Sequence, residues 1–342
     1  MMKNWLAAGA VALTVGMTST IANAQSTTVP GEQVGLAVGA PLPEGIYAIN
    51  TFTYRRPDAP SSALSGSADT AVNIPVLVWA TPLVPFGGRI ELVVAPPTVF
   101  AFTRNPAGVR NKDISINVGT FVGGIWAFDL GGNFGVSLLG GVYLNDLNGD
   151  RGSLYSGAFA PNPLVPGGLS PVGTPILPQL SSNTYRFGVA GSYTGNGWNL
   201  TANITANFYD SPGRFGGPVG AAIGPIRLSD ALNFDLTATK KFGNFEIGAV
   251  GYGTYNFDIS QFSAAFNNRG RFALGGLVGY DFKVFTVQAY VARDVVTGAT
   301  YTSALGQTRT NYSTDGWIRL IVPLYTAAPA PSPVPAPLVR KY

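Results

Sequence analysis

Amide and hydroxyl side chains recur at every second position of one segment of the chain. The series is Asn199, Thr201, Asn203, Thr205, Asn207 and Tyr209. The intervening positions hold Trp198, Leu200, Ala202, Ile204, Ala206 and Phe208. Since alternate side chains of a β-strand point to opposite faces, this pattern predicts a strand with one polar and one apolar face. A membrane-spanning barrel strand requires that division, because one face meets lipid and the other meets a polar lumen.

The residue types needed for common catalytic chemistry are missing from the chain. It has no histidine and no cysteine, which excludes Ser-His-Asp hydrolysis, cysteine nucleophiles and most zinc sites. We find no G-x-S-x-G elbow, phosphate-binding loop or dinucleotide fingerprint. We therefore predict that the protein is not an enzyme and uses no cofactor.

One short motif could hold a cation. Asp146, Asn148 and Asp150 place oxygen ligands at alternate positions, as at the start of a calcium loop. The rest of that loop pattern is missing, including its distal glutamate. The motif is therefore only a weak candidate metal site, and we favour a strand end at which Asp and Asn form Asx turns.

Period-2 runs divided by turn residues predict about twelve strands, although fourteen remains an alternative. The predicted strands are 45–56, 71–82, 88–102, 113–130, 133–148, 184–195, 197–209, 231–242, 245–258, 271–282, 284–297 and 314–325. Pro96-Pro97 interrupts the third run, where we expect a bulge or a bend. Short Gly/Asn turns alternate with long loops, the layout of an outer-membrane barrel with its short turns in the periplasm. We therefore predict an all-β, transmembrane, antiparallel up-and-down β-barrel.

The composition and the first residues agree with an exported membrane protein. Charged residues make up 11% of the chain, against about 25% in ordinary soluble domains. Lys3, the apolar run 5–17 and Ala22-Asn23-Ala24 form a signal peptide with cleavage expected before Gln25. Several aromatic residues fall near the expected periplasmic strand ends with outward parity, as in an interfacial girdle.

The remaining chain divides into three expected parts. After the signal peptide (1–24), residues 25–44 form an N-terminal segment in the periplasm or in the lumen, and 45–325 form the barrel. The Pro/Ala-rich residues 326–342 form an extended C-terminal tail. The loop 149–183 could fold into the lumen, cap it or stay mobile.

Strand parity assigns a set of polar side chains to the lumen, because a charge that faces lipid is costly. These pore-lining candidates are Glu91, Arg186, Asn199, Asn203, Asn207, Asp235, Glu246, Asp281, Gln288 and Arg319. Their mixed charges would form pairs across a narrow lumen. For any single residue we favour bracing of the barrel over contact with a solute.

Four stretches resemble the "MetA-pathway of phenol degradation" outer-membrane family. They are 31–37 (GEQVGLA), 39–47 (GAPLPEGIY), 73–82 (NIPVLVWATP) and 317–325 (WIRLIVPLY). The resemblance implies a Gram-negative outer-membrane barrel that occurs near catabolic functions and admits aromatic or other hydrophobic compounds. It supplies no catalytic or ligand residues, and the Pro/Ala-rich tail departs from the family pattern.

The sequence and the resemblance together predict an outer-membrane channel for passive uptake of small hydrophobic or aromatic compounds. The alternatives are a structural or adhesive barrel that acts through its extracellular loops, and an exported soluble β-protein. The expected partners are outer-membrane lipid and lipopolysaccharide, the barrel assembly machinery and a small-molecule solute. We expect a monomer that does not bind nucleic acid, since the chain has no dense Lys/Arg patch.

Overall fold

The computed structural model describes residues 29–58, 68–103, 114–117, 119–144, 183–209, 230–257, 270–302 and 307–327. Its strands are β1 (Gly45–Pro57), β2 (Ala68–Ala80), β3 (Gly88–Ala95), β4 (Thr98–Thr103), β5 (Ile114–Asn117), β6 (Thr120–Gly131), β7 (Phe134–Leu144), β8 (Thr184–Tyr193), β9 (Trp198–Tyr209), β10 (Ala231–Phe242), β11 (Phe245–Asn256), β12 (Gly270–Asp281), β13 (Thr286–Thr297), β14 (Thr300–Thr302), β15 (Thr308–Thr310) and β16 (Ser313–Thr326). Short 3-10 turns lie at η1 (Pro85–Gly87) and η3 (Gly195–Gly197). No helix within these ranges is long and apolar enough to cross a bilayer.

Several of the expected features lie outside the described residues. These are the signal peptide, the cation motif Asp146–Asn148–Asp150, residues 149–182 of the long loop and the tail after residue 327. The expectations about these segments therefore stay predictions.

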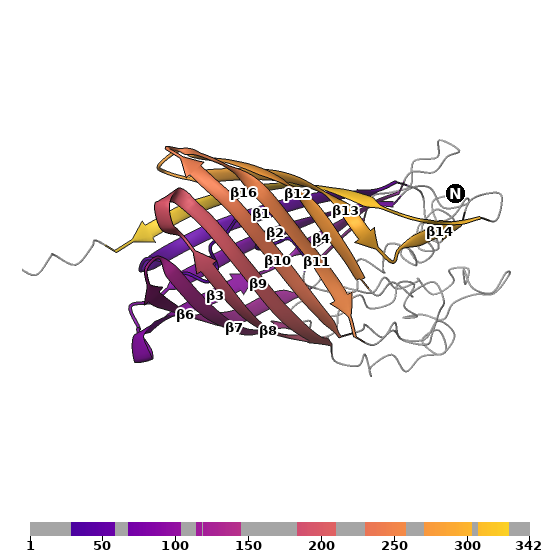
Figure 1. Cartoon of the computed structure of the whole chain (residues 1–342). Coiled ribbons are helices and arrows are strands. Elements are labelled where there is room, and N and C mark those ends of the chain that lie inside the picture. The colour runs from indigo at the N-terminus through magenta and orange to yellow at the C-terminus, as the bar shows by residue number, and fades with distance from the viewer. Residues whose placement is uncertain are drawn as a thin grey trace, which may run out of the picture.

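The described strands form a closed antiparallel barrel with tilted strands (Figure 1). β1 closes the sheet, because it pairs with β2 on one side and with β16 on the other. β3 and β4 both pair with β2, and β6 and β5 pair with them in turn, so these four strands are the halves of two wall strands. The wall therefore has twelve strands, which confirms the predicted all-β barrel. β14 and β15 form a separate two-stranded sheet.

The interruption at Pro96-Pro97 is a break in the hydrogen-bond ladder without a change of register. Val94 pairs with Leu77 before the break, and Thr98 pairs with Asn73 after it. The same register continues across the three residues between these pairs on each strand and sets Pro96 opposite Pro75. Neither proline has an N–H to donate, so the ladder opens there without the extra residue of a bulge.

The turns at one end of the barrel are short and use residues that tolerate positive φ. Asn133, Asn196 and Lys283 have φ of 67°, 54° and 72°, and Gly243 has φ of 63°. Asn and Gly adopt this conformation at little cost, whereas Lys283 is held there while its backbone N–H donates to the Asp281 carboxylate at 2.7 Å. These tight turns are the connections that the sequence pattern predicts for the periplasmic end.

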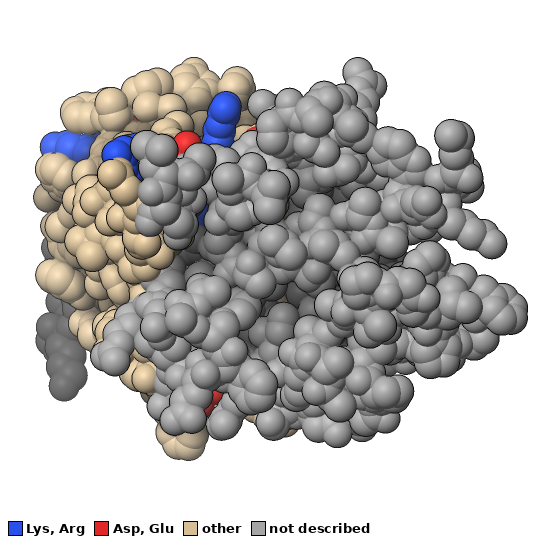
Figure 2. All heavy atoms as spheres, turned by 90° about the vertical axis from the view of Figure 1, so that its right-hand side faces the viewer, with Lys and Arg blue, Asp and Glu red and all other residues tan. Residues whose placement is uncertain are grey.

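The outer wall is apolar and carries aromatic side chains near the short turns. Trp126 packs against Phe128 with ring centroids 4.8 Å apart, and Phe282 stacks on Phe285 at 4.7 Å. In the view onto the other end of the barrel, the described surface that is visible is mainly uncharged, with a few basic and acidic side chains near the top and an acidic one lower down (Figure 2). A lipid-facing surface with an aromatic girdle has this composition.

The interior contains two apolar clusters rather than a continuous polar lining. One lies between β1, β2, β3, β6 and β7, and its members are Tyr47, Val72, Ile74, Val78, Ala80, Val93, Ala95, Phe121 and Tyr143. The other lies on β11, β12, β13 and β16 and includes Val34 from the segment that precedes β1. The inward face of β2 from Val72 to Ala80 is thus as apolar as its outward face, whereas β3 turns Glu91 inward beside Val93 and Ala95.

Candidate functional site in the lumen

Residues 29–44 run through the barrel interior as a chain of tight turns. Backbone N–H groups donate to the carbonyl three residues earlier from Glu32 to Val29, from Val34 to Gly31, from Leu36 to Gln33 and from Ala40 to Ala37. Gly31 and Gly35 adopt φ of 100° and 84°, which other residues reach only with strain. We call residues 29–44 the luminal segment.

Wall side chains on β8 and β10 hold the luminal segment by its backbone. The Asp235 carboxylate accepts the N–H of Gly31 at 2.7 Å and the N–H of Gln33 at 3.3 Å. Thr237 Oγ1 accepts the N–H of Gly35 at 2.8 Å, and Ser192 Oγ accepts that of Gly39 at 2.9 Å. These polar wall groups therefore bind the chain itself.

Arg319 on β16 binds the luminal segment from the other side. Its guanidinium is fully buried and donates to the carbonyl oxygens of Val34 and Glu32. It also donates to Thr51 Oγ1 at 2.9 Å and to Gln288 Oε1 at 3.2 Å. A buried guanidinium needs such a set of acceptors to offset its loss of hydration.

A third attachment joins side chain to side chain. Arg186 on β8 forms an ion pair with Glu32 of the luminal segment. The same Nη1 donates to the Tyr143 hydroxyl at 3.3 Å. Arg186 is only 3% exposed, so this charge is held in the interior by its carboxylate partner.

A separate buried ion network braces four wall strands. Arg271 on β12 donates to Asp294 on β13 and to Asp315 on β16, both at 2.7 Å. Arg55 on β1 lies 3.5 Å from Asp315. Two cations and two carboxylates therefore balance each other across neighbouring strands, which is the bracing expected of mixed charges in a narrow barrel.

The ten predicted pore-lining residues fall into three groups. Seven bond directly to the luminal segment: Glu91, Arg186, Asn199, Asn203, Asp235, Gln288 and Arg319. Glu246 accepts from Thr239 at 2.5 Å and from Gln288 at 3.0 Å, and Asn207 donates to the Ala231 carbonyl at 3.4 Å. Asp281 lies apart from these, at the tight turn where it accepts from Lys283. A role in lining a solute path stays a prediction for all ten.

The luminal segment leaves a cavity of about 280 Å³ against the β1–β8 side of the barrel. Its wall is mainly apolar and is formed by Ile49, Ile74, Val76, Val78, Val93, Ala95, Phe121, Ile125 and Leu139, with Leu36, Ala37, Val38, Ala40, Pro41 and Leu42 from the luminal segment. Its polar lining residues are Glu32, Gln33, Thr51, Glu91, Tyr143 and Arg186. We call this cavity the luminal chamber. A small apolar molecule fits it, since a dry apolar cavity of about 150 Å³ can hold benzene.

Sequence reasoning did not identify the apolar residues of the luminal chamber. The search for pore-lining residues looked for polar side chains at every second position of a strand. In β2 the stretch N-I-P-V-L-V-W has apolar residues on both faces. The useful signal was this missing alternation in the runs 71–82 and 88–102. A strand that is apolar on both faces within a lipid-facing barrel indicates an apolar interior.

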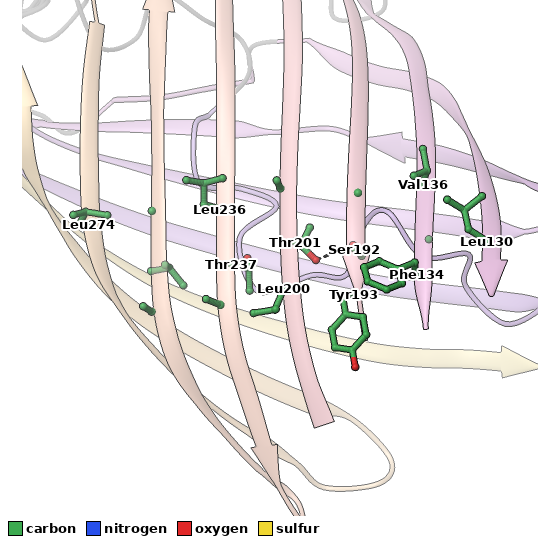
Figure 3. Close-up of a pocket in the computed structure, with 17 residues that line it drawn as sticks. Leu130, Phe134, Val136, Ser192, Tyr193, Leu200, Thr201, Leu236, Thr237 and Leu274 are labelled. Carbon is green, nitrogen blue, oxygen red and sulfur yellow. Dashed lines mark hydrogen bonds between the residues drawn. The ribbon is translucent and has the colours of Figure 1, made fainter. Parts of the chain in front are cut away.

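A second hollow, of about 590 Å³, lies across the wall from β6 to β12 (Figure 3). Small residues Ala202, Ala238 and Ala249 lie between Leu200, Leu236 and Leu274. The three leucines are 41–48% exposed and have the outward parity of their strands. This hollow therefore belongs to the lipid-facing surface rather than to the lumen.

Among the described residues, no group of three or more acidic side chains is placed to hold a metal ion.

Comparison with known proteins agrees with this architecture. The family model described as "Putative MetA-pathway of phenol degradation" matches residues 53–309. None of the curated proteins matches the chain. Among solved structures, the COG4313 outer membrane channel from Pseudomonas putida F1 has 10% sequence identity and a TM-score of 0.54, with 83% of this chain and 97% of that chain covered.

Two further solved structures align with lower scores. A deltaS2S3 mutant of the TodX monoaromatic hydrocarbon channel has 10% identity and a TM-score of 0.44, with 90% of this chain and 99% of that chain covered. The NanC porin has 10% identity and a TM-score of 0.43, with coverage of 81% and 100%. The fold is that of a Gram-negative outer-membrane barrel, and the chain belongs to the MetA-pathway of phenol degradation family.

Proposed function

We propose that this protein is a passive, non-enzymatic outer-membrane channel for small, mainly apolar solutes, aromatic compounds among them. The luminal chamber carries this proposal. Within the described interior it is a cavity with a mainly apolar lining that lies between the wall and the luminal segment. Apolar lining with a few placed polar groups is typical of small-molecule sites.

The barrel size supports a selective path over general diffusion. Barrels of about 16–18 strands leave an open aqueous channel, whereas about eight strands fill their own interior. Twelve strands enclose room for the luminal segment and for a chamber of about 280 Å³. Solutes near the size of a single substituted ring suit this space, and oligosaccharides do not. We also propose that the channel works as a monomer inserted by the barrel assembly machinery.

A permeability assay tests the proposal. The mature protein is placed in vesicles with lipopolysaccharide in the outer leaflet, and uptake of benzyl alcohol, benzamide, glucose and sucrose is compared with that of protein-free vesicles. We expect faster uptake of the two aromatic compounds and little effect on sucrose. Equal rates with and without protein for every solute would contradict a channel and leave the structural or adhesive role.

A further inference from the structure

The Arg186–Glu32 pair places a buried cation and its carboxylate partner in the wall of a mainly apolar chamber. Arg186 belongs to the barrel wall on β8, and Glu32 belongs to the luminal segment. Both line the luminal chamber with Val76, Val93 and Phe121. The chamber therefore combines a surface for a hydrocarbon ring with a site that already binds a carboxylate.

The donors of Arg186 are incompletely used. Nη1 donates to Glu32 Oε1 and to the Tyr143 hydroxyl. Nε is buried and has no acceptor among the described residues. A guanidinium presents five N–H donors in a planar fork that matches a carboxylate in two-point contact. Glu32 occupies this fork through a single oxygen, so another carboxylate can bind Arg186 at least as fully.

We propose that the luminal chamber binds a small aromatic carboxylate, whose carboxylate group replaces Glu32 on Arg186. This inference rests on the proposed channel function and names one solute class for it. The ring of the ligand contacts the aliphatic and aromatic wall, and its carboxylate meets Arg186 beside the Tyr143 hydroxyl. Glu91 is the other wall carboxylate of the chamber.

The exchange couples solute binding to the luminal segment. An unpaired guanidinium in the interior is costly, so Glu32 leaves Arg186 readily only when another anion takes its place. The backbone carbonyl of Glu32 is also an acceptor for Arg319. An aromatic acid competes with the Glu32 side chain for Arg186, which is one attachment of the luminal segment. A neutral analogue of the same shape does not compete.

Benzoate and benzamide form a matched pair for the test, because they share the ring and differ in charge. Uptake of both is measured in vesicles that contain the full mature chain, as the wild type, Glu32→Gln, Arg186→Met and Thr237→Val. Glu32→Gln removes the competing charge and leaves Arg186 in place. Thr237→Val is the matched control, since it removes the uncharged acceptor for the Gly35 N–H and changes no charge in the lumen.

We expect Glu32→Gln to raise the benzoate-to-benzamide rate ratio by about tenfold, the size of one charge-assisted hydrogen bond. Arg186→Met lowers the ratio, and Thr237→Val changes both rates alike. An unchanged ratio in Glu32→Gln, or an equal rise in Thr237→Val, overturns the inference.

A binding measurement separates this inference from the transport proposal. Benzoate is titrated calorimetrically into the detergent-solubilised barrel, and heat-modifiable gel mobility shows that each variant is folded. Tighter binding of benzoate to Glu32→Gln than to the wild type supports the inference, whatever the vesicle rates. Passage of benzamide without any benzoate binding overturns the inference and leaves the channel intact. Failure of both solutes to pass contradicts the channel.

Discussion

Asn199 and Asn203 illustrate how single residues work in this barrel. Their amides face inward, as strand alternation requires, and they bond to the Gly35 carbonyl at 3.1 Å and to Gln33 Oε1 at 2.6 Å. Sequence alternation predicted the direction of these side chains but not their partners. The partners come from a segment more than 160 positions earlier, and a two-residue period contains no information about such a contact.

Arg319 is expected to be the strongest single attachment of the luminal segment. Arg319→Met removes its donors to Val34, Glu32 and Thr51, leaving buried acceptors unsatisfied. We expect a loss of about 3 kcal/mol in the free energy of unfolding, the scale of a lost buried charge-assisted hydrogen bond. The measurement is a urea titration of the vesicle-inserted barrel. Arg309→Met is the control, because Arg309 is exposed and donates to the nearby Gln307; equal losses in both variants would refute the prediction.

Gly39 lies where the backbone of the luminal segment passes close against the backbone of β8. A Cβ at this position would lie 2.5 Å from the backbone nitrogen of Ser192, and that wall strand cannot yield. We expect Gly39→Ala to move the segment away from β8 and to raise single-channel conductance in planar bilayers. At Gly191 a Cβ meets nothing within 4 Å, so Gly191→Ala should conduct like the wild type. Identical conductance of Gly39→Ala and Gly191→Ala would show that the segment is not held there.

At the scale of elements, the strands were predictable and the luminal segment was not. Twelve period-2 runs with alternating short and long connections match the observed wall, including the tight turns at Asn196 and Gly243. Residues 29–44 have no such period and are rich in Gly and Pro. Wall groups such as Asp235 and Arg319 determine where these residues lie. The local sequence therefore could not decide between a position in the periplasm and one in the lumen.

The barrel wall does not depend on the luminal segment for its strand pairing. β1 is hydrogen-bonded to β16 and β2 along its length, so a chain without residues 25–42 should still close. Polar groups that held the segment would then be hydrated. We expect this deletion variant to retain heat-modifiable mobility and to show a several-fold larger conductance. A folded deletion variant with wild-type conductance would mean that the segment does not occlude the lumen.

At the scale of the whole molecule, the apolar outer wall requires a lipid environment around the barrel. Leu236 is 41% exposed at the middle of β10, and its surroundings are apolar. Few charges and many glycines made the lipid-facing wall predictable from composition. The division of the interior into a hydrogen-bonded side and an apolar side was not predictable. A strand can have the same apolar outward face whether its inward face is polar or apolar.

A charge on the lipid-facing wall tests the membrane assignment. Leu236→Arg should destabilise the barrel folded in vesicles by about 2–4 kcal/mol, since an arginine near the bilayer midplane is poorly solvated. Tyr325→Arg, near the end of β16 that lies with the short turns, should cost no more than about 1 kcal/mol. Equilibrium folding from urea into vesicles measures both values. Similar costs at both sites would contradict the expected position of the bilayer.

The central claim is that small aromatic solutes occupy the luminal chamber. Val93 and Val94 are neighbours on β3, but Val93 lines the chamber and is 8% exposed, whereas Val94 faces outward and is 43% exposed. Val93→Trp fills the chamber, and Val94→Trp adds the same side chain to the lipid-facing surface. The decisive measurement is benzyl alcohol uptake into vesicles with a lipopolysaccharide outer leaflet. The account predicts that Val93→Trp loses most of the protein-dependent rate while Val94→Trp keeps it, and equal rates in the two variants would contradict it.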